Sequence, residues 1–277
     1  MVNKSVFLAA LSLVSLSPLY AHSDKEEHVH SQEAQSHKDT AQPTVKMSIV
    51  NVEDKGDKKL VKIKLSLIED DSPVNASDLE VAHTEKVHLL IIDDGLEDYH
   101  HIHPDVDPEP GIYTFEWTPK KKANYRMWAD LHPTSTDAQE YVIAGLTTDQ
   151  KHAAIDKTAS SEATVDNYKF KLSFDEKELK AGKAVMGRVS ITDDKGQPVR
   201  ELEPIMGAYA HIVGFGDEFK NIVHIRPMGT EPSSPVDRGG PDLQFHLEPE
   251  KSGFIKLFVQ VKINGKELFA PFGIQVN

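Results

Sequence analysis

The 277-residue chain contains no cysteine. It can therefore build no disulfide framework, carries no lipoprotein attachment site and offers no thiolate nucleophile. Because blue-copper electron transfer needs a thiolate on the metal, that class of protein is excluded. The sequence also lacks a Gly-x-Ser-x-Gly elbow and a glycine-rich loop that could cradle phosphate. Catalysis has little support, and we expect a protein that is not an enzyme.

Long hydrophobic runs are scarce as well. The apolar stretch at residues 6–16 follows the basic residue Lys4 and precedes Ala21, a small residue suited to cleavage. It is shorter than the about 20 residues of a membrane-spanning helix. The pattern predicts a secretory signal peptide over residues 1–21, with a membrane anchor as the alternative. We expect a periplasmic or secreted protein with no membrane insertion after signal cleavage.

Positive charge is in the minority. The chain has 31 Lys and Arg against 44 Asp and Glu, a formal net charge of −13. This acidity argues against nucleic acid as a partner, because basic patches are needed to neutralise phosphates. It also disfavours docking on anionic lipid. It favours solubility and the attraction of cations.

Aromatic residues are missing from residues 22–44, a polar and charged stretch that cannot bury apolar surface. We expect this histidine-rich tail to be disordered. His28 and His30 could present two imidazoles to one ion, and cleavage after Ala21 would give His22 a free amine beside its imidazole. Capture of a metal ion by the tail and a plain solvated linker both remain open.

A long helical period is absent, and alternation of apolar and polar residues takes its place. Residues 58–68 and 168–174 alternate as half-buried antiparallel strands do, and Asn264-Gly265 is a strong hairpin signal. Short strands separated by turn signals favour a sandwich. We predict an all-β protein of tandem immunoglobulin-like antiparallel β-sandwiches behind the disordered tail.

One phrase occurs twice in the sequence, which predicts two related structural units. Leu79-Glu80 recurs as Leu202-Glu203, and the offset of 123 residues is kept by the pairs His88/His211 and His101/His224. We therefore divide the chain after the signal and tail into a first β-sandwich repeat at 45–148, a linker at 149–163 and a second repeat at 164–277.

The repeated histidines suggest metal ligands, because imidazoles from separate strands commonly hold copper or zinc. His101 and His103 are two residues apart on an extended segment, so their side chains point the same way. His88 falls on a preceding strand and His83 just before it. The first repeat therefore predicts a site formed by His83, His88, His101 and His103.

The second repeat offers His211 and His224 at the matching places, while Arg226 replaces His103. His246, on the next expected strand, could restore a third nitrogen. A structural duty for the shared histidines, as a hydrogen-bond partner of a backbone carbonyl, is an equally open interpretation.

The run His83-Thr84-Glu85-Lys86-Val87-His88, with Tyr99-His100-His101-Ile102-His103-Pro104 after it, resembles exported bacterial two-repeat β-sandwich proteins. These are loosely grouped with YtkA-like and heavy-metal-associated periplasmic proteins. The run at residues 206–211 and Phe245-His246 are similar to the second unit of that family. The resemblance covers most of residues 79–277 and implies copper or heavy-metal handling near the envelope. This chain departs from it at Arg226, where a second His-x-His would be expected.

These observations lead to a hypothesis with two alternatives. We expect an exported metal-binding protein, with copper as its ion, that acts as a buffer, carrier or resistance factor and could meet an envelope protein. Zinc is the alternative metal, since imidazole suits both ions. The competing class is an adhesive or scaffolding pair of sandwiches whose histidines are structural.

Overall fold

The computed structural model describes residues 42–146, 152–219, 222–225 and 227–277. Within this part of the chain the regular structure is β-strand, apart from one 3₁₀ turn at Ala76–Asp78. The predicted all-β fold class is confirmed. The signal peptide expected at residues 1–21 lies outside the described residues, as do the tail histidines His22, His28 and His30.

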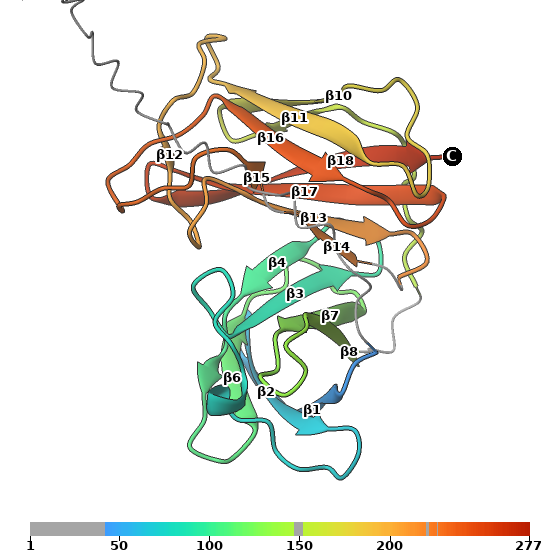
Figure 1. Cartoon of the computed structure of the whole chain (residues 1–277), viewed down its shortest axis with the longest axis vertical. Helices are drawn as coiled ribbons and strands as arrows, with labels where there is room; N and C mark the ends of the chain where they lie inside the picture. The colour runs from blue at the N-terminus through green and yellow to red at the C-terminus, as the bar shows by residue number, and fades with distance from the viewer. Residues whose placement is uncertain (1–41, 147–151, 220–221, 226) are drawn as a thin grey trace, which may run out of the picture. The chain divides into compact units, whose positions relative to one another are not determined.

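The first repeat is built from two antiparallel sheets, with strand orders β1-β2-β6-β5 and β4-β3-β7-β8 (Figure 1). Alternate residues of β2, such as Val61, Ile63 and Leu65, are fully buried and share one core cluster with residues of the second sheet. The strands are β1 (Val45–Lys55), β2 (Lys58–Leu67), β3 (Val87–Asp93), β4 (Tyr99–Ile102), β5 (Asp105–Val106), β6 (Ile112–Trp117), β7 (Tyr125–Leu131) and β8 (Glu140–Leu146).

The second repeat also has two antiparallel sheets, with strand orders β15-β16-β11-β10-β9 and β12-β17-β13-β14, and β18 pairs with β17 (Figure 1). Its core lies between them and includes Phe170, Phe245 and Phe272. The strands are β9 (Glu162–Val165), β10 (Tyr168–Phe174), β11 (Val185–Thr192), β12 (Leu202–Glu203), β13 (His211–Gly216), β14 (Ile222–Ile225), β15 (Pro227–Met228), β16 (Asp242–Leu247), β17 (Gly253–Ile263) and β18 (Lys266–Val276).

The two repeats keep the same strand register around the histidines. In the first repeat Leu90 on β3 pairs with His101 on β4, and in the second Val213 on β13 pairs with His224 on β14. Both pairs obey the offset of 123 residues. The internal repeat seen in the sequence is therefore a repeat of structure.

Two tight turns obey the same offset. His83 and Thr84 occupy the middle of the first turn with φ of 49° and 75°, and Met206 and Gly207 occupy the second with φ of 49° and 73°. Each turn is closed by backbone hydrogen bonds between its outer residues. Positive φ at both central positions is the signature of a type I′ hairpin turn.

Strand β9 begins at Glu162, inside the segment 149–163 that we expected to act only as a linker. It pairs with β10, and Ala163 and Val165 pack against the core of the second repeat. Its four residues alternate between exposed and half-buried, a pattern too short to predict a strand alone, so the pairing with β10 decides its conformation.

A third apolar cluster joins the two repeats. Tyr99 and Trp128 of the first repeat contact Phe215 of the second, with ring centroids 5.3 and 5.5 Å apart. The buried members of this cluster are Leu90, Ile92, Leu96, Tyr99, Trp128, Val213, Phe215 and Phe258. Aromatic pairs at such distances add to the stabilisation from apolar burial. The sheet β4-β3-β7-β8 therefore has apolar contacts on both faces.

Candidate metal centre

Three histidines of the first repeat bring one ring nitrogen each to a common point. His88, His101 and His103 have ligand atoms that all lie within 4.8 Å of one another. His88 Nδ1 is 3.1 Å from His101 Nε2 and 3.1 Å from His103 Nε2. His88 comes from β3, His101 from β4 and His103 from the segment just after β4. This cluster is the candidate metal centre.

The outer nitrogen of His88 is tied to a turn. His88 Nε2 donates to the carbonyl oxygen of Ala82 at 2.8 Å, and a carbonyl can only accept. The proton of the neutral ring therefore sits on Nε2, which leaves Nδ1 as a lone pair directed at the other two histidines. Hydrogen bonds of this kind on the outer nitrogen fix the tautomer and orientation of metal-ligating histidines.

The outer nitrogen of His101 is held by the second repeat. His101 Nδ1 lies 2.9 Å from Gln260 Oε1, and Gln260 Nε2 donates to Glu267 Oε2 at 2.9 Å. Because the carboxylate of Glu267 accepts, the amide of Gln260 turns its oxygen toward His101, and we assign the proton of neutral His101 to Nδ1. Its Nε2 is then a lone pair facing Nδ1 of His88.

The spacing of these nitrogens suits a small transition-metal ion. Imidazole nitrogens bound at about 2.05 Å lie about 3.3 Å apart in tetrahedral geometry and about 2.9 Å apart at right angles. The observed separations of 3.1 Å fall between these two values. The third pair, between His101 and His103, is within the 4.8 Å that bounds the whole group.

A buried carboxylate lies beside the cluster. Asp130 on β7 is 3% exposed and is the register partner of His88 on β3, so the two side chains share one face of the sheet. Asp130 accepts a hydrogen bond from Gln139 Nε2 at 2.7 Å. Burial and the negative charge of Asp130 raise the pKa of Tyr99 well above its ordinary value. The same charge favours a cation at the histidines.

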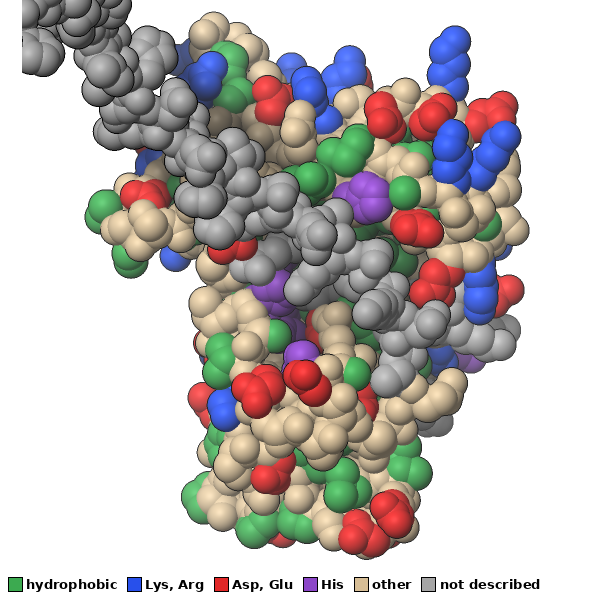
Figure 2. Space-filling model, in the orientation of Figure 1, with side chains coloured by type: hydrophobic (Ala, Val, Ile, Leu, Met, Phe, Trp, Pro, Cys, Tyr) green, Lys and Arg blue, Asp and Glu red, His purple; other side chains and the backbone are tan. Residues whose placement is uncertain are grey.

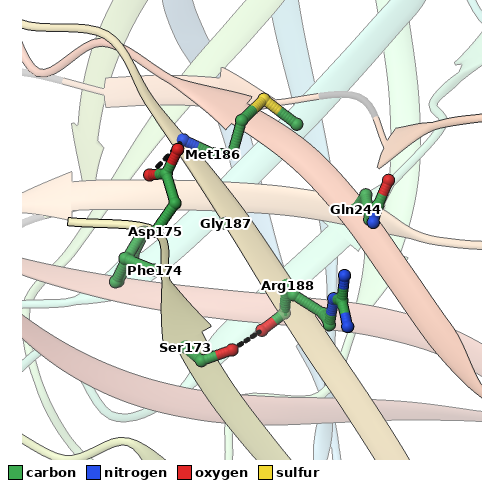
Figure 3. Close-up of a pocket in the computed structure, with 7 residues that line it drawn as sticks. All are labelled: Ser173, Phe174, Asp175, Met186, Gly187, Arg188 and Gln244. Carbon is green, nitrogen blue, oxygen red and sulfur yellow. Dashed lines mark hydrogen bonds between the residues drawn. The ribbon is translucent and has the colours of Figure 1, made fainter.

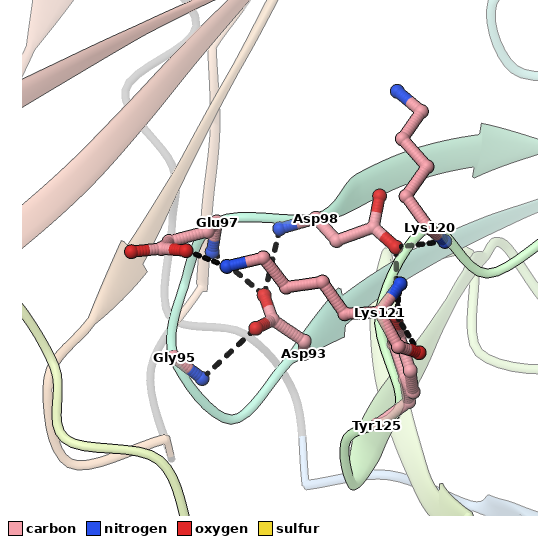
Figure 4. Close-up of polar contacts among 7 residues, drawn as sticks. All are labelled: Asp93, Gly95, Glu97, Asp98, Lys120, Lys121 and Tyr125. Carbon is pink, nitrogen blue, oxygen red and sulfur yellow. Dashed lines mark hydrogen bonds and ion pairs between the residues drawn. The ribbon is translucent and has the colours of Figure 1, made fainter.

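The hairpin that places β4 beside β3 is fixed by Asp93 (Figure 4). Asp93 Oδ1 accepts from the backbone nitrogens of Glu97 at 2.6 Å and Asp98 at 2.7 Å, and Oδ2 accepts from that of Gly95 at 3.2 Å. The sequence Asp93-Asp94-Gly95 thus forms a turn. It sets the register that brings His101 next to Leu90.

Asp98 continues this network toward β7. Its carboxylate accepts from the backbone nitrogen of Lys120 and from the hydroxyl of Tyr125, each at 2.7 Å (Figure 4). Burial alone would raise the pKa of Asp98, but the hydrogen bonds from His100 and Tyr125 bring it below its ordinary value. An ionised Asp98 therefore helps to hold the hairpin that carries His101.

His83, the fourth histidine predicted for this site, lies next to the cluster and outside the group of three. Its ring contacts that of His88 at 5.9 Å between centroids and that of His211 at 5.6 Å. The turn position with φ of 49° holds the ring near the cluster.

Of the second-repeat site that we expected from His211, His224 and His246, the structure describes the side chains of His211 and His246, which come from different sheets. His211 is 1% exposed, and its Nε2 lies 3.2 Å from the carbonyl oxygen of Ile205, the counterpart of Ala82. Its ring instead approaches the first repeat, 5.9 Å from His101 between centroids. A histidine that fixes a turn carbonyl is thus the part common to both repeats.

His246, another second-repeat candidate, lies elsewhere. His246 is on β16 in the other sheet, between Phe245 and Leu247, which are fully buried in the core. Because side chains alternate along a strand, His246 points away from that core and from His211. The side chain of His224, and Arg226 as a whole, lie outside the described residues. Sequence spacing missed this outcome because it does not reveal which sheet a strand joins.

Solvent reaches the centre, because His101 and His103 are only partly buried. Figure 2 shows histidine side chains that reach the surface on the face drawn. Burial nevertheless lowers the pKa of His103 below its ordinary value of 6.5. At neutral pH this ring is therefore uncharged, which is the state that binds metal.

A shallow pocket in the second repeat lies apart from the three-histidine cluster (Figure 3). It has a volume of about 200 Å³, and strands β10, β11 and β16 supply most of its lining. The lining residues are Ser173, Phe174, Asp175, Met186, Gly187, Arg188 and Gln244. Asp175 accepts the backbone N–H of Met186 at 2.9 Å, so its carboxylate is engaged in the local fold. We assign no ligand to this pocket.

Fold and site together define a two-repeat β-sandwich protein with a three-histidine cluster next to the junction of its repeats. The chain matches the family described as "Domain of unknown function (DUF8832)" over residues 38–144 and 163–277. It belongs to this family, and the two matched regions agree with a family of two repeats. A search of curated proteins found no match. In the part of the chain that the structure describes, no helix is long and apolar enough to cross a membrane.

Solved structures resemble the chain only distantly. MtrC from Shewanella baltica is 7% identical with a TM-score of 0.25, over 83% of this chain and 68% of that one. A glycosyl hydrolase family 2 member from Bacteroides cellulosilyticus is 13% identical with a TM-score of 0.26, over 79% and 23%. A DUF4785 family protein from Legionella pneumophila is 8% identical with a TM-score of 0.27, over 84% and 62%. At these TM-scores the likenesses carry no argument about function.

Proposed function

We propose that this protein is an exported, non-catalytic metal-binding protein that takes up copper at His88, His101 and His103. It acts as a periplasmic or secreted buffer, carrier or resistance factor. The tail histidines His22, His28 and His30 collect the ion or pass it on. An envelope protein that delivers or receives the metal is a fitting partner.

One observation carries this proposal: three imidazole nitrogens converge while outer hydrogen bonds hold the protons of two rings away from the centre. His88 Nε2–H donates a hydrogen bond to the carbonyl of Ala82, and His101 Nδ1–H donates one to Gln260 Oε1. The inner nitrogens of these two rings are then lone pairs only 3.1 Å apart. Such lone pairs repel unless a proton or a cation lies between them.

Copper is favoured over zinc on affinity. A nitrogen-donor site generally binds divalent copper more tightly than any other first-row divalent ion, zinc included. The buried carboxylate of Asp130 and the net charge of −13 favour any cation. Imidazole also suits zinc, so zinc remains the alternative ion and a convenient probe that undergoes no redox change.

The test is calorimetric titration at pH 7.5 with copper(II) and with zinc(II). The full chain is compared with a shortened form that begins at Gln42, two residues before Thr44, whose backbone nitrogen donates to Glu140. We expect binding at micromolar or lower dissociation constants in both forms. His88→Ala and His103→Ala should abolish it, whereas His152→Ala, at a side chain that is 85% exposed, should not.

Loss of all binding in the shortened form would place the metal in the tail and reduce the repeat histidines to structure. Absence of binding by either form would overturn the proposal. It would favour the second candidate, a scaffolding or adhesive sandwich pair with structural histidines. One observation supports that candidate: His211, like His88, is bonded to the carbonyl of the turn six residues before it.

A further inference from the structure

The candidate metal centre belongs to the first repeat, yet one of its hydrogen bonds crosses to the second. Gln260 lies on β17 as the register partner of His211, and its side chain oxygen is 2.9 Å from His101 Nδ1. Gln260 is 2% exposed, so this contact is sheltered from water. A sheltered hydrogen bond has little competition from solvent and holds its geometry well.

Glu267 on β18 decides which way the amide of Gln260 points. It sits diagonally across the β17–β18 ladder, where Lys262 is its register partner and Gln260 lies two residues further along. Long side chains reach across such a diagonal. Gln260 Nε2 donates to Glu267 Oε2 at 2.9 Å, so the amide oxygen is left to accept from His101.

Ring contacts place a second part of the same repeat against the centre. The ring of His211 lies 5.9 Å from that of His101 and 5.6 Å from that of His83. The apolar cluster that joins the repeats contains Val213, two residues from His211, and Phe258, two residues from Gln260. Packing between the repeats thus holds Gln260 at its distance from His101.

We propose that Glu267 and Gln260 of the second repeat are positioning residues for the metal centre of the first repeat. By accepting the Nδ1 proton of His101, Gln260 turns the lone pair of Nε2 toward His88 and His103. The second repeat then serves as the outer support of a site whose ligands lie in the first. This inference rests on the proposed function, since it names what orients one of the three ligands.

The experiment compares zinc affinity at pH 7.5 for the full-length protein and a set of variants. Gln260→Ala removes the acceptor, and loss of an outer hydrogen-bond partner of a ligand typically weakens metal binding by about 10- to 100-fold. We expect a loss in that range. Gln244→Ala on β16, at an exposed glutamine outside the site, is the matched control and should leave the affinity unchanged.

A paired exchange separates positioning from packing. Gln260→Glu alone puts two carboxylates where Gln260 and Glu267 now meet, so it should weaken binding. Adding Glu267→Gln lets the new glutamine donate to the new carboxylate, which still accepts from His101. The double variant should therefore bind zinc within about threefold of the wild type, because a second outer partner is restored.

A nitrogen-15 NMR spectrum of the zinc-free wild type gives a readout that needs no variant to fold. We expect His101 to show the tautomer with its proton on Nδ1. The opposite tautomer would overturn the inference, and so would Gln260→Ala with unchanged affinity. In those cases zinc binding by the wild type and its loss in His88→Ala would leave the proposed function standing. Absence of zinc and copper binding by the wild type would overturn both.

Discussion

His88 Nδ1 lies 3.1 Å from His101 Nε2, and the other nitrogen of each ring donates a hydrogen bond to a fixed oxygen acceptor. Two lone pairs at that distance repel, so the metal-free protein must place a proton between the rings or tolerate the repulsion. A metal ion relieves this conflict by binding both nitrogens. The centre is therefore arranged in advance for a cation, and little rearrangement opposes binding.

Metal should raise the thermal stability of the folded protein. A ligand that binds only the folded state stabilises it by about 2.7 kcal/mol at 100 times its dissociation constant. For a chain of this size we expect zinc at such an excess to raise the melting temperature by roughly 5–10 °C. Differential scanning calorimetry with and without zinc, followed by a chelator, would measure this shift. An unchanged melting temperature in all three samples would contradict the prediction.

His88 and His211 should differ in one respect when each is replaced by alanine. Both substitutions remove one of the two donors to a turn carbonyl, whose other donor is a backbone N–H, and the loss of one hydrogen bond costs about 0.5–1.5 kcal/mol of unfolding free energy. Both variants should therefore melt earlier than the wild type. Only His88→Ala removes a nitrogen of the three-histidine group, so only this variant should lose zinc binding. Urea denaturation and zinc titration of the two variants would separate these effects.

Loss of zinc binding in both variants to the same degree would mean that His211 is itself a ligand. Retention of binding in His88→Ala would contradict the assignment of the centre. His152→Ala, at an exposed side chain, is the control for both measurements.

The sequence predicted much of the fold because apolar and polar residues alternate along strands that bury one face, such as β2 and β10. Residues 168–174 form β10 as expected, and the Asn264-Gly265 turn joins β17 to β18 with positive φ at both residues. Strand β9 could not be predicted, since an alternation of only four residues is too short a signal and the strand forms by pairing with β10. Local patterns fix strands that bury one face, and pairing fixes the others.

The grouping of His88, His101 and His103 was also within reach of the sequence. Two histidines on an extended segment and one on the adjoining hairpin strand must share a face when the register is right. The contribution of Gln260 could not be predicted from the sequence, because its contact with His101, 159 residues away, depends on how the repeats pack. In the structure Gln260 occupies the place of Asp130, because Asp130 is the register partner of His88 and Gln260 that of His211. Packing also separates His246 from His211, which spacing alone could not reveal.

Metal affinity should fall as the solution is acidified. Protons compete with metal for imidazole nitrogen, and each ring that must lose a proton weakens binding by up to about tenfold per pH unit below its pKa. Burial lowers the pKa of His103, so this ring stays neutral to a pH below 6.5. We expect zinc affinity to change little above pH 7 and to drop steeply between pH 6.5 and 5. Zinc titrations at half-unit steps of pH would measure the curve.

His103 should also make the metal-free protein less stable in acid. Its folded pKa lies below the unfolded value, so the unfolded chain binds more protons in the interval between them. The contribution of His103 to stability is therefore present above pH 6.5 and is lost as the pH falls through the folded pKa. The ionised state of Asp98 is lost only below its ordinary value of 3.8, in a separate window. His103→Gln should make the free energy of unfolding depend less on pH as the pH falls from 6.5 through the folded pKa of His103. An unchanged pH dependence in that range would contradict the assignment.

Replacing Thr84 by glycine should stabilise the first repeat. Thr84 is exposed and adopts φ of 75°, a left-handed conformation that costs a β-branched residue about 1–3 kcal/mol. Glycine adopts it without that strain but loses about 0.5–1 kcal/mol through its greater freedom in the unfolded chain. The second repeat already has glycine at this place, Gly207 with φ of 73°. We expect Thr84→Gly to gain about 1 kcal/mol, or a melting temperature higher by roughly 2–4 °C.

Gly207→Thr is the matched control and should lose a similar amount. His88 donates to the backbone carbonyl of Ala82, which the substitution at Thr84 leaves in place. Thr84→Gly should therefore keep the zinc affinity of the wild type. A lower melting temperature in that variant would mean that the turn depends on a contact of the threonine side chain.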